Sequence, residues 1–201
     1  MITPCFSSLF FEQSALKLAE ELLGHFLIRK INGKKIKAMI VETEAYCGAI
    51  DKASHAFNNK RTKRTEPMFL QGGHSYIYLI YGLNYCFNVV AEKEGNPEAV
   101  LIRAVEPVEG LDIIKQNRPE IDKLENLTNG PGKLAKALSI DISLNGCNLI
   151  NGKELYIEKN LKKPIFSIVS AKRIGIDYAE EFKDKLWRKY IEGNTFVSKK
   201  I

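Results

Sequence analysis

The stretch IVETEAY, residues 40–46, decides the fold because it ends the longest strand that the sequence predicts. From Lys34 to Ala45 apolar and polar residues alternate, as they do in a strand with one buried face. If the alternation continues, Glu42, Glu44 and Tyr46 fall on the face that carries the apolar side chains. The sequence therefore predicts two carboxylates on the buried side of a strand.

Two carboxylates on a buried face admit two interpretations. Burial without a partner disfavours the charged form and raises the pKa of a carboxylate, so Glu42 and Glu44 are candidates for acid or base chemistry. Alternatively, the strand end is frayed, and both side chains are solvated or paired with some of the many lysines. The stretch alone leaves both interpretations open.

Hairpins dominate the rest of the predicted fold. Phe26–Ile31 reads as a strand, and Asn32-Gly33 is the strongest short signal for a hairpin turn into the strand that begins at Lys34. Further strands are expected at residues 75–81, 85–91, 99–106, 154–157 and 164–169. The prediction is one α+β domain over residues 1–201, a mostly antiparallel curved sheet with β-hairpins and surrounding helices.

Four helical segments accompany these strands. Ser14 is placed to cap a helix over Ala15–Leu23, with Gly24 as its stop. Pro107 is expected to open a helix whose inner face carries Ile113 and Ile114. A helical run is expected at residues 135–138, and a short packed helix near Trp187.

Composition narrows the class of protein. The chain has 201 residues, 45% of them hydrophobic, and a net charge of +6, which makes polyanions plausible partners. Its four cysteines form no C-x-x-C pair, which argues against a structural zinc site or an iron–sulfur cluster. We find no signal peptide and no apolar run of membrane-spanning length, so we expect a cytoplasmic protein (nucleoid-associated if bacterial, nuclear if eukaryotic).

Basic and aromatic residues suggest contact with nucleic acid. The long polar segment 48–67 carries four basic residues at positions 60–64 and is either a mobile solvated loop or a surface that contacts phosphates. Tyr76 and Tyr78 share one strand face, whereas Tyr81 lies at the tip of a hairpin. Most strand tyrosines simply pack, but a tyrosine at a tip is well placed to wedge between bases.

Three further features bear on a site. Arg103 interrupts an apolar strand and needs an anionic partner, for which Glu42, Glu44 or a ligand phosphate are the candidates. Gly130-Pro131-Gly132-Lys133 leads into a helix and is either a plain helix start or an anion-binding loop. The basic stretch 171–176 is expected to line a surface.

Together these parts suit an enzyme that acts on one base of a duplex. The base must leave the stack, aromatic rings can hold it, and a carboxylate can activate water. One alternative is a metal site, whose candidate ligands would be Glu42, Glu44, Asp51 and His55, although no known ligand spacing supports it. Another is a module that stacks single strands without chemistry.

Several motifs, taken in order, resemble the alkyladenine (3-methyladenine) DNA glycosylase family of the mammalian type. The motifs are Val41–Tyr46, Ala53–His55, Tyr76–Gly82, Asn88, Leu101–Pro107, Gly130–Leu134, Arg173–Ile176 and Gly193-Asn194. They cover nearly the whole chain. The resemblance implies a monomeric, monofunctional enzyme without metal or cofactor. It implies removal of damaged purines from double-stranded DNA by hydrolysis of the N-glycosidic bond, which is the first step of base excision repair.

The resemblance also implies a role for each matching residue. Glu44 would be the base that activates water. Because one perturbed carboxylate suffices as a general base, we expect Glu42 to be a structural partner rather than a second catalytic group. The base-binding pocket would consist of Tyr46, His55, Tyr78 and Asn88, of which Asn88 would reject guanine by crowding its exocyclic amine. Tyr81 would be the intercalating wedge, and the nucleotide and its phosphates would be supported by Arg103 and Lys133.

Overall fold

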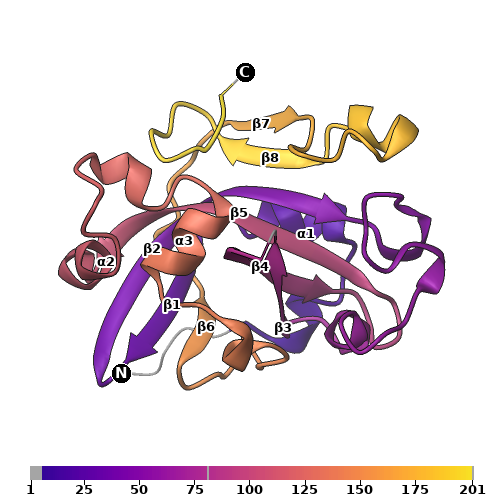
Figure 1. Cartoon of the computed structure of the whole chain (residues 1–201), viewed down its shortest axis with the longest axis horizontal. Coiled ribbons are helices and arrows are strands. Elements are labelled where there is room, and N and C mark those ends of the chain that lie inside the picture. The colour runs from indigo at the N-terminus through magenta and orange to yellow at the C-terminus, as the bar shows by residue number, and fades with distance from the viewer. Residues whose placement is uncertain (1–5, 81, 201) are drawn as a thin grey trace.

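All strands belong to one curled antiparallel sheet in the computed structural model, which describes residues 6–80 and 82–200 (Figure 1). The order is β3-β4-β5-β2-β1-β6, and β8 pairs both with β2 and with β7. The strands are β1 (Phe26–Ile31), β2 (Lys34–Tyr46), β3 (Ser75–Ile80), β4 (Asn84–Ala91), β5 (Glu98–Glu109), β6 (Leu155–Glu158), β7 (Ile168–Ala171) and β8 (Arg188–Ile191).

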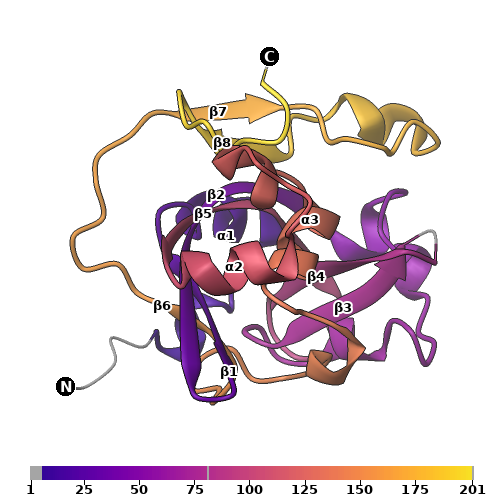
Figure 2. The same ribbon diagram turned by 60° about the vertical axis from the view of Figure 1, so that its left-hand side comes forward.

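Helices are short and surround the sheet, as Figure 2 shows from a second direction. The α-helices of the described residues are α1 (Ala15–Glu21), α2 (Leu111–Asn117) and α3 (Pro131–Ala137). Single 3-10 turns occupy Ser8–Phe10, Gly48–Ile50, Phe57–Asn59, Glu66–Phe69, Leu124–Leu127, Ile142–Leu144 and Glu180–Asp184. The predicted α+β class with a mostly antiparallel, curved sheet is confirmed.

Local signals produced the first elements as expected. Asn32 and Gly33 both have positive φ (49° and 77°), which is the backbone that a two-residue hairpin turn of the primed type requires. The Ser14 side chain accepts a hydrogen bond from the Lys17 amide and so caps α1. The helix ends at Glu21, a little before the predicted end.

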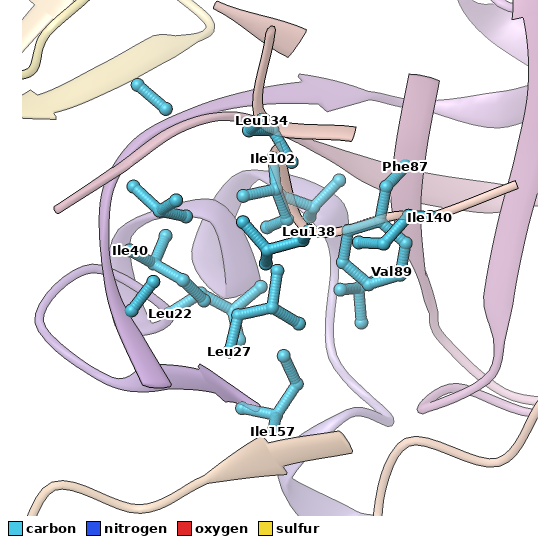
Figure 3. Close-up of a cluster of buried hydrophobic side chains, with 14 of the residues drawn as sticks. Leu22, Leu27, Ile40, Phe87, Val89, Ile102, Leu134, Leu138, Ile140 and Ile157 are labelled. Atoms are coloured by element: carbon cyan, nitrogen blue, oxygen red, sulfur yellow. The ribbon is translucent and has the colours of Figure 1, made fainter. Parts of the chain in front are cut away.

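The core lies between the curled sheet and the helices (Figure 3). Leu27 and Ile40 from β1 and β2 meet Ile102 from β5, and Leu134 of α3 packs onto them. All four side chains are fully buried. Burying such a side chain stabilises the fold by about 1.5–3 kcal/mol, so this cluster holds β2 and β5 in place.

The pairing of β2 with β5 is irregular at its centre. Between Ile40 and Glu42, β2 advances two residues while β5 advances one, so Val41 is an extra residue on β2. Between Glu42 and Thr43 the shift is reversed, and Arg103 is the extra residue on β5. Such irregularities redirect the side chains around them.

This irregularity makes the predicted strand face wrong. Val41 joins the main core, and Thr43 donates a hydrogen bond to a carbonyl of α1 (2.8 Å). Glu42, Glu44 and Tyr46 therefore point away from the main core, and Tyr46 packs in a separate cluster. A strict alternation had placed them on the apolar face.

Other boundaries also differ from the sequence prediction. Pro107 lies inside β5, and the helix begins only at Leu111, because Gly110 with φ 78° makes the turn. The next helix starts at Pro131, before the predicted residue 135, and β7 starts at Ile168 instead of residue 164. Near Trp187 a 3-10 turn is followed by β8, because pairing with β2 extends the C-terminal chain. In the described residues, no helix has the length and apolar character needed to cross a membrane.

His25 gives the fold a predictable response to pH. Its ring is 7% exposed and packs edge-on against Phe6, and its Nδ1 accepts a hydrogen bond from the Asn160 amide (2.9 Å). Burial, followed by the charges of two nearby lysines, lowers the pKa of His25 from 6.5 to about 4. The unfolded chain therefore binds the proton first, so the stability from the neutral ring is full above pH 6.5 and is lost as pH falls towards 4.

We expect His25→Asn, which keeps an acceptor, to flatten this pH dependence. The difference in slope between wild type and variant should reach at most about 1.4 kcal/mol per pH unit. Urea unfolding between pH 4 and 7.5 measures it. Parallel curves for the two proteins would contradict the assignment.

Candidate active site

A cavity of about 490 Å³ opens on the sheet face opposite the main core. Its lining comes from the end of β2, the loop after it, β3, β4, β5 and the segment 174–178. The structure thus brings together five of the predicted site residues, namely Tyr46, His55, Tyr78, Asn88 and Arg103.

Aromatic rings form one wall of the cavity. The His55 and Tyr78 rings meet edge to face with centroids 4.6 Å apart, and Tyr76 lies 5.5 Å from Tyr78. The pKa of Tyr78 is raised by burial, and that of Tyr76 is raised to about 12 for the same reason. Both phenols therefore keep their protons at neutral pH.

His55 is a neutral side chain in this wall. Burial, followed by the charge of Arg64, lowers the pKa of His55 to about 4. Its Nε2 lies 3.4 Å from Arg64 Nη2, which can only donate, so Nε2 accepts and Nδ1 carries the proton. Nδ1 then donates to the Tyr76 hydroxyl (2.8 Å). At neutral pH the ring offers stacking surface and no charge.

Asn88 is a fixed, buried part of the cavity lining. Its side chain is 3% exposed, and Nδ2 donates to the Tyr76 carbonyl across the β3–β4 pair (3.0 Å). This bond sets the plane of the amide. A rigid amide in a cavity can discriminate between molecules by shape and by hydrogen bonding.

Glu44 is held directly behind the wall of the cavity by three donors. Its Oε1 accepts from the Ile174 amide (2.8 Å), and its Oε2 accepts from the Tyr46 hydroxyl (3.0 Å) and lies 3.3 Å from Arg103 Nη1. Burial, followed by the charge of Glu44, raises the pKa of Tyr46, which therefore stays a donor. All three partners line the cavity, while the carboxylate itself is fully buried behind them. The frayed-end interpretation is wrong.

Glu42 is paired differently from Glu44. Its Oε1 accepts from Arg103 Nε (3.1 Å), Arg188 Nη1 (3.0 Å) and the Ser198 hydroxyl (2.9 Å), and its Oε2 accepts from the Ser198 amide (2.6 Å). None of these bonds reaches the cavity except through Arg103. The expectation that Arg103 pairs with a carboxylate of β2 is confirmed, and it contacts both.

Arg173 and Asp51 form another buried pair that the sequence did not reveal. The predicted basic surface at 171–176 is wrong for Arg173, which is 5% exposed and binds Asp51 with two hydrogen bonds (2.5 and 2.9 Å). Asp51 is thus paired with Arg173 and His55 with Tyr76, whereas Glu42 and Glu44 share Arg103. In the described part of the chain, no group of three or more acidic, histidine or cysteine side chains could hold a metal ion.

Lys133 lies beside the cavity. It lines a smaller cleft of about 390 Å³ together with Asn84, Arg118 and Lys136, and its Nζ donates to the Asn129 side chain (2.7 Å). Pro131 lines both the cleft and the cavity. The cleft is therefore a basic extension of the site.

The predicted wedge, Tyr81, lies outside the described residues. Its neighbour Ile80 lines the cavity, and Leu83 after the turn is 82% exposed. The end of β3 therefore lies at the cavity. The predicted basic loop reaches the same cavity, because Arg64 also lines it and lies 5.1 Å from the centre of the Tyr78 ring.

Fold and cavity define an enzyme-like site in which a planar group can lie against aromatic rings near one buried carboxylate. Comparison with known proteins names the class. The sequence pattern of the family described as Methylpurine-DNA glycosylase (MPG) matches residues 9–195. The chain therefore belongs to the methylpurine-DNA glycosylase family, in agreement with the resemblance noted in its motifs. It is a DNA glycosylase that acts on alkylated bases, a hydrolase of N-glycosyl bonds in base excision repair.

Individual relatives agree over nearly their full length. A protein of Natranaerobius thermophilus is 53% identical over 190 residues, which cover 94% of this chain and 96% of that protein. Proteins of Clostridium tetani and Desulfitobacterium hafniense are 53% and 52% identical over 198 residues, covering 95% of this chain and 97% of each. All three are provisionally named 3-methyladenine DNA glycosylases.

Glu42→Gln tests the structural role of Glu42. The change leaves Arg103 and Arg188 without their shared buried carboxylate, and removing one partner of a buried ion pair costs about 3–5 kcal/mol. Urea unfolding should show that loss. Glu158→Gln, which breaks the partly exposed pair with Lys37, is the control and should cost clearly less. Equal losses in the two variants would refute the role.

Proposed function

We propose that residues 1–201 form a single glycosylase domain that hydrolyses the N-glycosidic bond of one damaged purine, alkylated or deaminated, in duplex DNA. The purine leaves the stack and enters the cavity, and the product is a free base and an abasic site. One observation carries the proposal: the buried Glu44 carboxylate lies directly behind the wall of an aromatic cavity, where it is held by three residues that line the cavity, Tyr46, Arg103 and Ile174.

The cavity suits a flipped base in size and chemistry. Its volume lies within the range of about 300–1,000 Å³ for small-molecule sites. Tyr46, His55 and Tyr78 offer neutral rings, and stacking on an aromatic ring contributes about 1–3 kcal/mol per base. A purine can therefore bind here without a charged partner for its ring.

Glu44 acts as the general base in this proposal. It takes a proton from water on the face of the sugar opposite the purine. The hydroxyl adds to the sugar carbon, and the purine leaves with the electrons of the glycosidic bond. A cationic or protonated purine is a good leaving group. Arg103 keeps the carboxylate oriented and supports the nucleotide electrostatically.

Selectivity arises at two stages. A weakly paired lesion costs less to flip, and Asn88, whose amide is fixed by Tyr76, crowds the exocyclic amine of guanine. Tyr81 fills the gap in the duplex as a wedge. Basic residues of the loop 60–64 and Lys133 contact phosphates.

The protein acts as a monomer and needs no cofactor. Its place is with the genome, which is the nucleoid of the cytoplasm if the chain is bacterial like the relatives above, or the nucleus if it is eukaryotic. A module that only stacks single strands would have no use for a carboxylate held by three donors at the cavity wall.

Base release by Glu44→Gln tests whether Glu44 is the general base. Duplexes with a single hypoxanthine, ethenoadenine or methylated purine are incubated in EDTA, and alkali then cuts any abasic site. Loss of a positioned general base should slow release roughly 10²–10⁴-fold while duplex binding stays nearly unchanged. Glu158→Gln serves as the matched control with wild-type rate. Equal turnover by Glu44→Gln would sink the proposal.

Lys133→Gln tests the phosphate role of the cleft. The change should weaken duplex binding equally for all sequences and reduce the slope of log affinity against log salt by about 0.9, the value for one phosphate contact. Fluorescence anisotropy at several salt concentrations measures the slope. Lys162→Gln is the control, since this exposed residue belongs to the segment that joins β6 to β7, and Figure 2 shows that segment on the opposite side from β3 and β4. An unchanged slope for Lys133→Gln would remove this contact.

A further inference from the structure

The guanidinium of Arg173 lies over two aromatic rings. Its Cζ is 4.7 Å from the centre of the Tyr46 ring and 4.9 Å from that of Trp187, and its side chain is fully buried. Tyr46 lines the cavity and donates to Glu44. Arg173 therefore backs a ring that belongs to the proposed site, although it does not line the cavity itself.

Asp51 fixes this guanidinium and the turn after β2. Both of its oxygens bind Arg173, and they also accept from the amides of Cys47 and Ala53 (3.2 and 3.0 Å). Ala53 stands two residues before His55. The same ion pair therefore determines where the chain carrying His55 leaves β2.

The main chain around Arg173 adds two links. Arg173 Nη1 donates to the Ala45 carbonyl between Glu44 and Tyr46 (2.9 Å), and the amide of the next residue, Ile174, donates to Glu44 (2.8 Å). Two segments more than a hundred residues apart in the sequence are joined here. The first hydrogen bond ends on Ala45, beside two residues of the proposed site, and the second ends on Glu44 itself.

We propose that the Arg173–Asp51 pair positions the reacting groups: it sets the Tyr46 ring, the Ile174 amide and the turn before His55, and so holds Glu44 where it can act on water. The inference rests on the proposed function of Glu44. Arg173 and Asp51 are positioning residues and touch neither base nor sugar.

The chemistry of the pair supports positioning over mere stabilisation. Replacing a buried ion pair by well-packed apolar residues is often neutral or stabilising, so stability alone does not require one. A planar guanidinium, by contrast, can stack on a ring and bind a carboxylate with two parallel hydrogen bonds at once. Only that combination fixes both the orientation of the Tyr46 ring and the orientation of the Asp51 carboxylate.

The double variant Arg173→Met/Asp51→Leu separates the two roles. It removes both charges together, so no buried charge is left unpaired, and the stability it loses should be that of the hydrogen bonds from the Cys47 and Ala53 amides to Asp51. Binding to a duplex with one ethenoadenine should be nearly unchanged. It is measured after adding Glu44→Gln to the wild type and to the double variant. Single-turnover release of ethenoadenine by the double variant with Glu44 intact should fall about 10²-fold, the effect of a displacement near 1 Å in a reacting geometry.

Two controls keep the test decisive. Lys37→Met/Glu158→Leu removes an ion pair between β2 and β6, away from the cavity, and should release base at the wild-type rate. Arg173→Lys keeps the charge and the fold but loses the planar fork, and should still slow release at least tenfold. Wild-type rates in the folded double variant, or in Arg173→Lys if the double variant does not fold, would overturn the inference. If the wild type and Glu44→Gln released base equally, the proposed function would fail instead.

Discussion

The central irregularity in the pairing of β2 with β5 is the constraint on which the site depends. One extra residue on each strand, Val41 and then Arg103, leaves the overall register of the two strands unchanged but reverses which side chains face the core. Glu42 and Glu44 thereby leave the apolar side and meet Arg103 on the other. Without the extra residues, the same sequence would place two carboxylates in the apolar core, where burying unpaired charge is strongly unfavourable.

The two carboxylates divide the available partners unequally. Glu42 binds two guanidinium groups and both donors of Ser198, so its oxygens are saturated by groups of which only Arg103 lines the cavity. Glu44 shares only Arg103 and otherwise accepts from a phenol and a backbone amide, all at the cavity wall. The two neutral donors orient the Glu44 carboxylate without placing a further positive charge beside it. This difference supports a structural role for Glu42 and a chemical role for Glu44.

The sequence predicted what local signals control. The Asn32-Gly33 turn, the Ser14 cap and the shared face of Tyr76 and Tyr78 depend on residues within a few positions of each other, and the structure confirms all three. The convergence of Tyr46, His55 and Asn88 followed only from the combined motifs. The spacing of residues within any one strand or helix does not predict that these three side chains meet.

What the sequence could not predict depends on partners far along the chain. The face of Glu42 and Glu44 is set by a shift against β5, and Arg173 looked like a surface residue because its partner Asp51 stands 122 positions earlier. The C-terminal strand forms because β2 offers an edge to β8. A window of ten or twenty residues contains none of these contacts.

The charge state of the cavity has a consequence for the lesions it would process. His55, with a pKa of about 4, is neutral at pH 7 and commits its proton to Tyr76, and burial keeps the tyrosines protonated. None of these aromatic groups is a strong acid at neutral pH, so the wall gives a departing purine stacking surface rather than a proton. In the proposed reaction, a purine made cationic by alkylation needs no such proton, whereas a neutral lesion must obtain one elsewhere. In the proposed reaction, the aromatic wall therefore favours the departure of purines that carry their own positive charge.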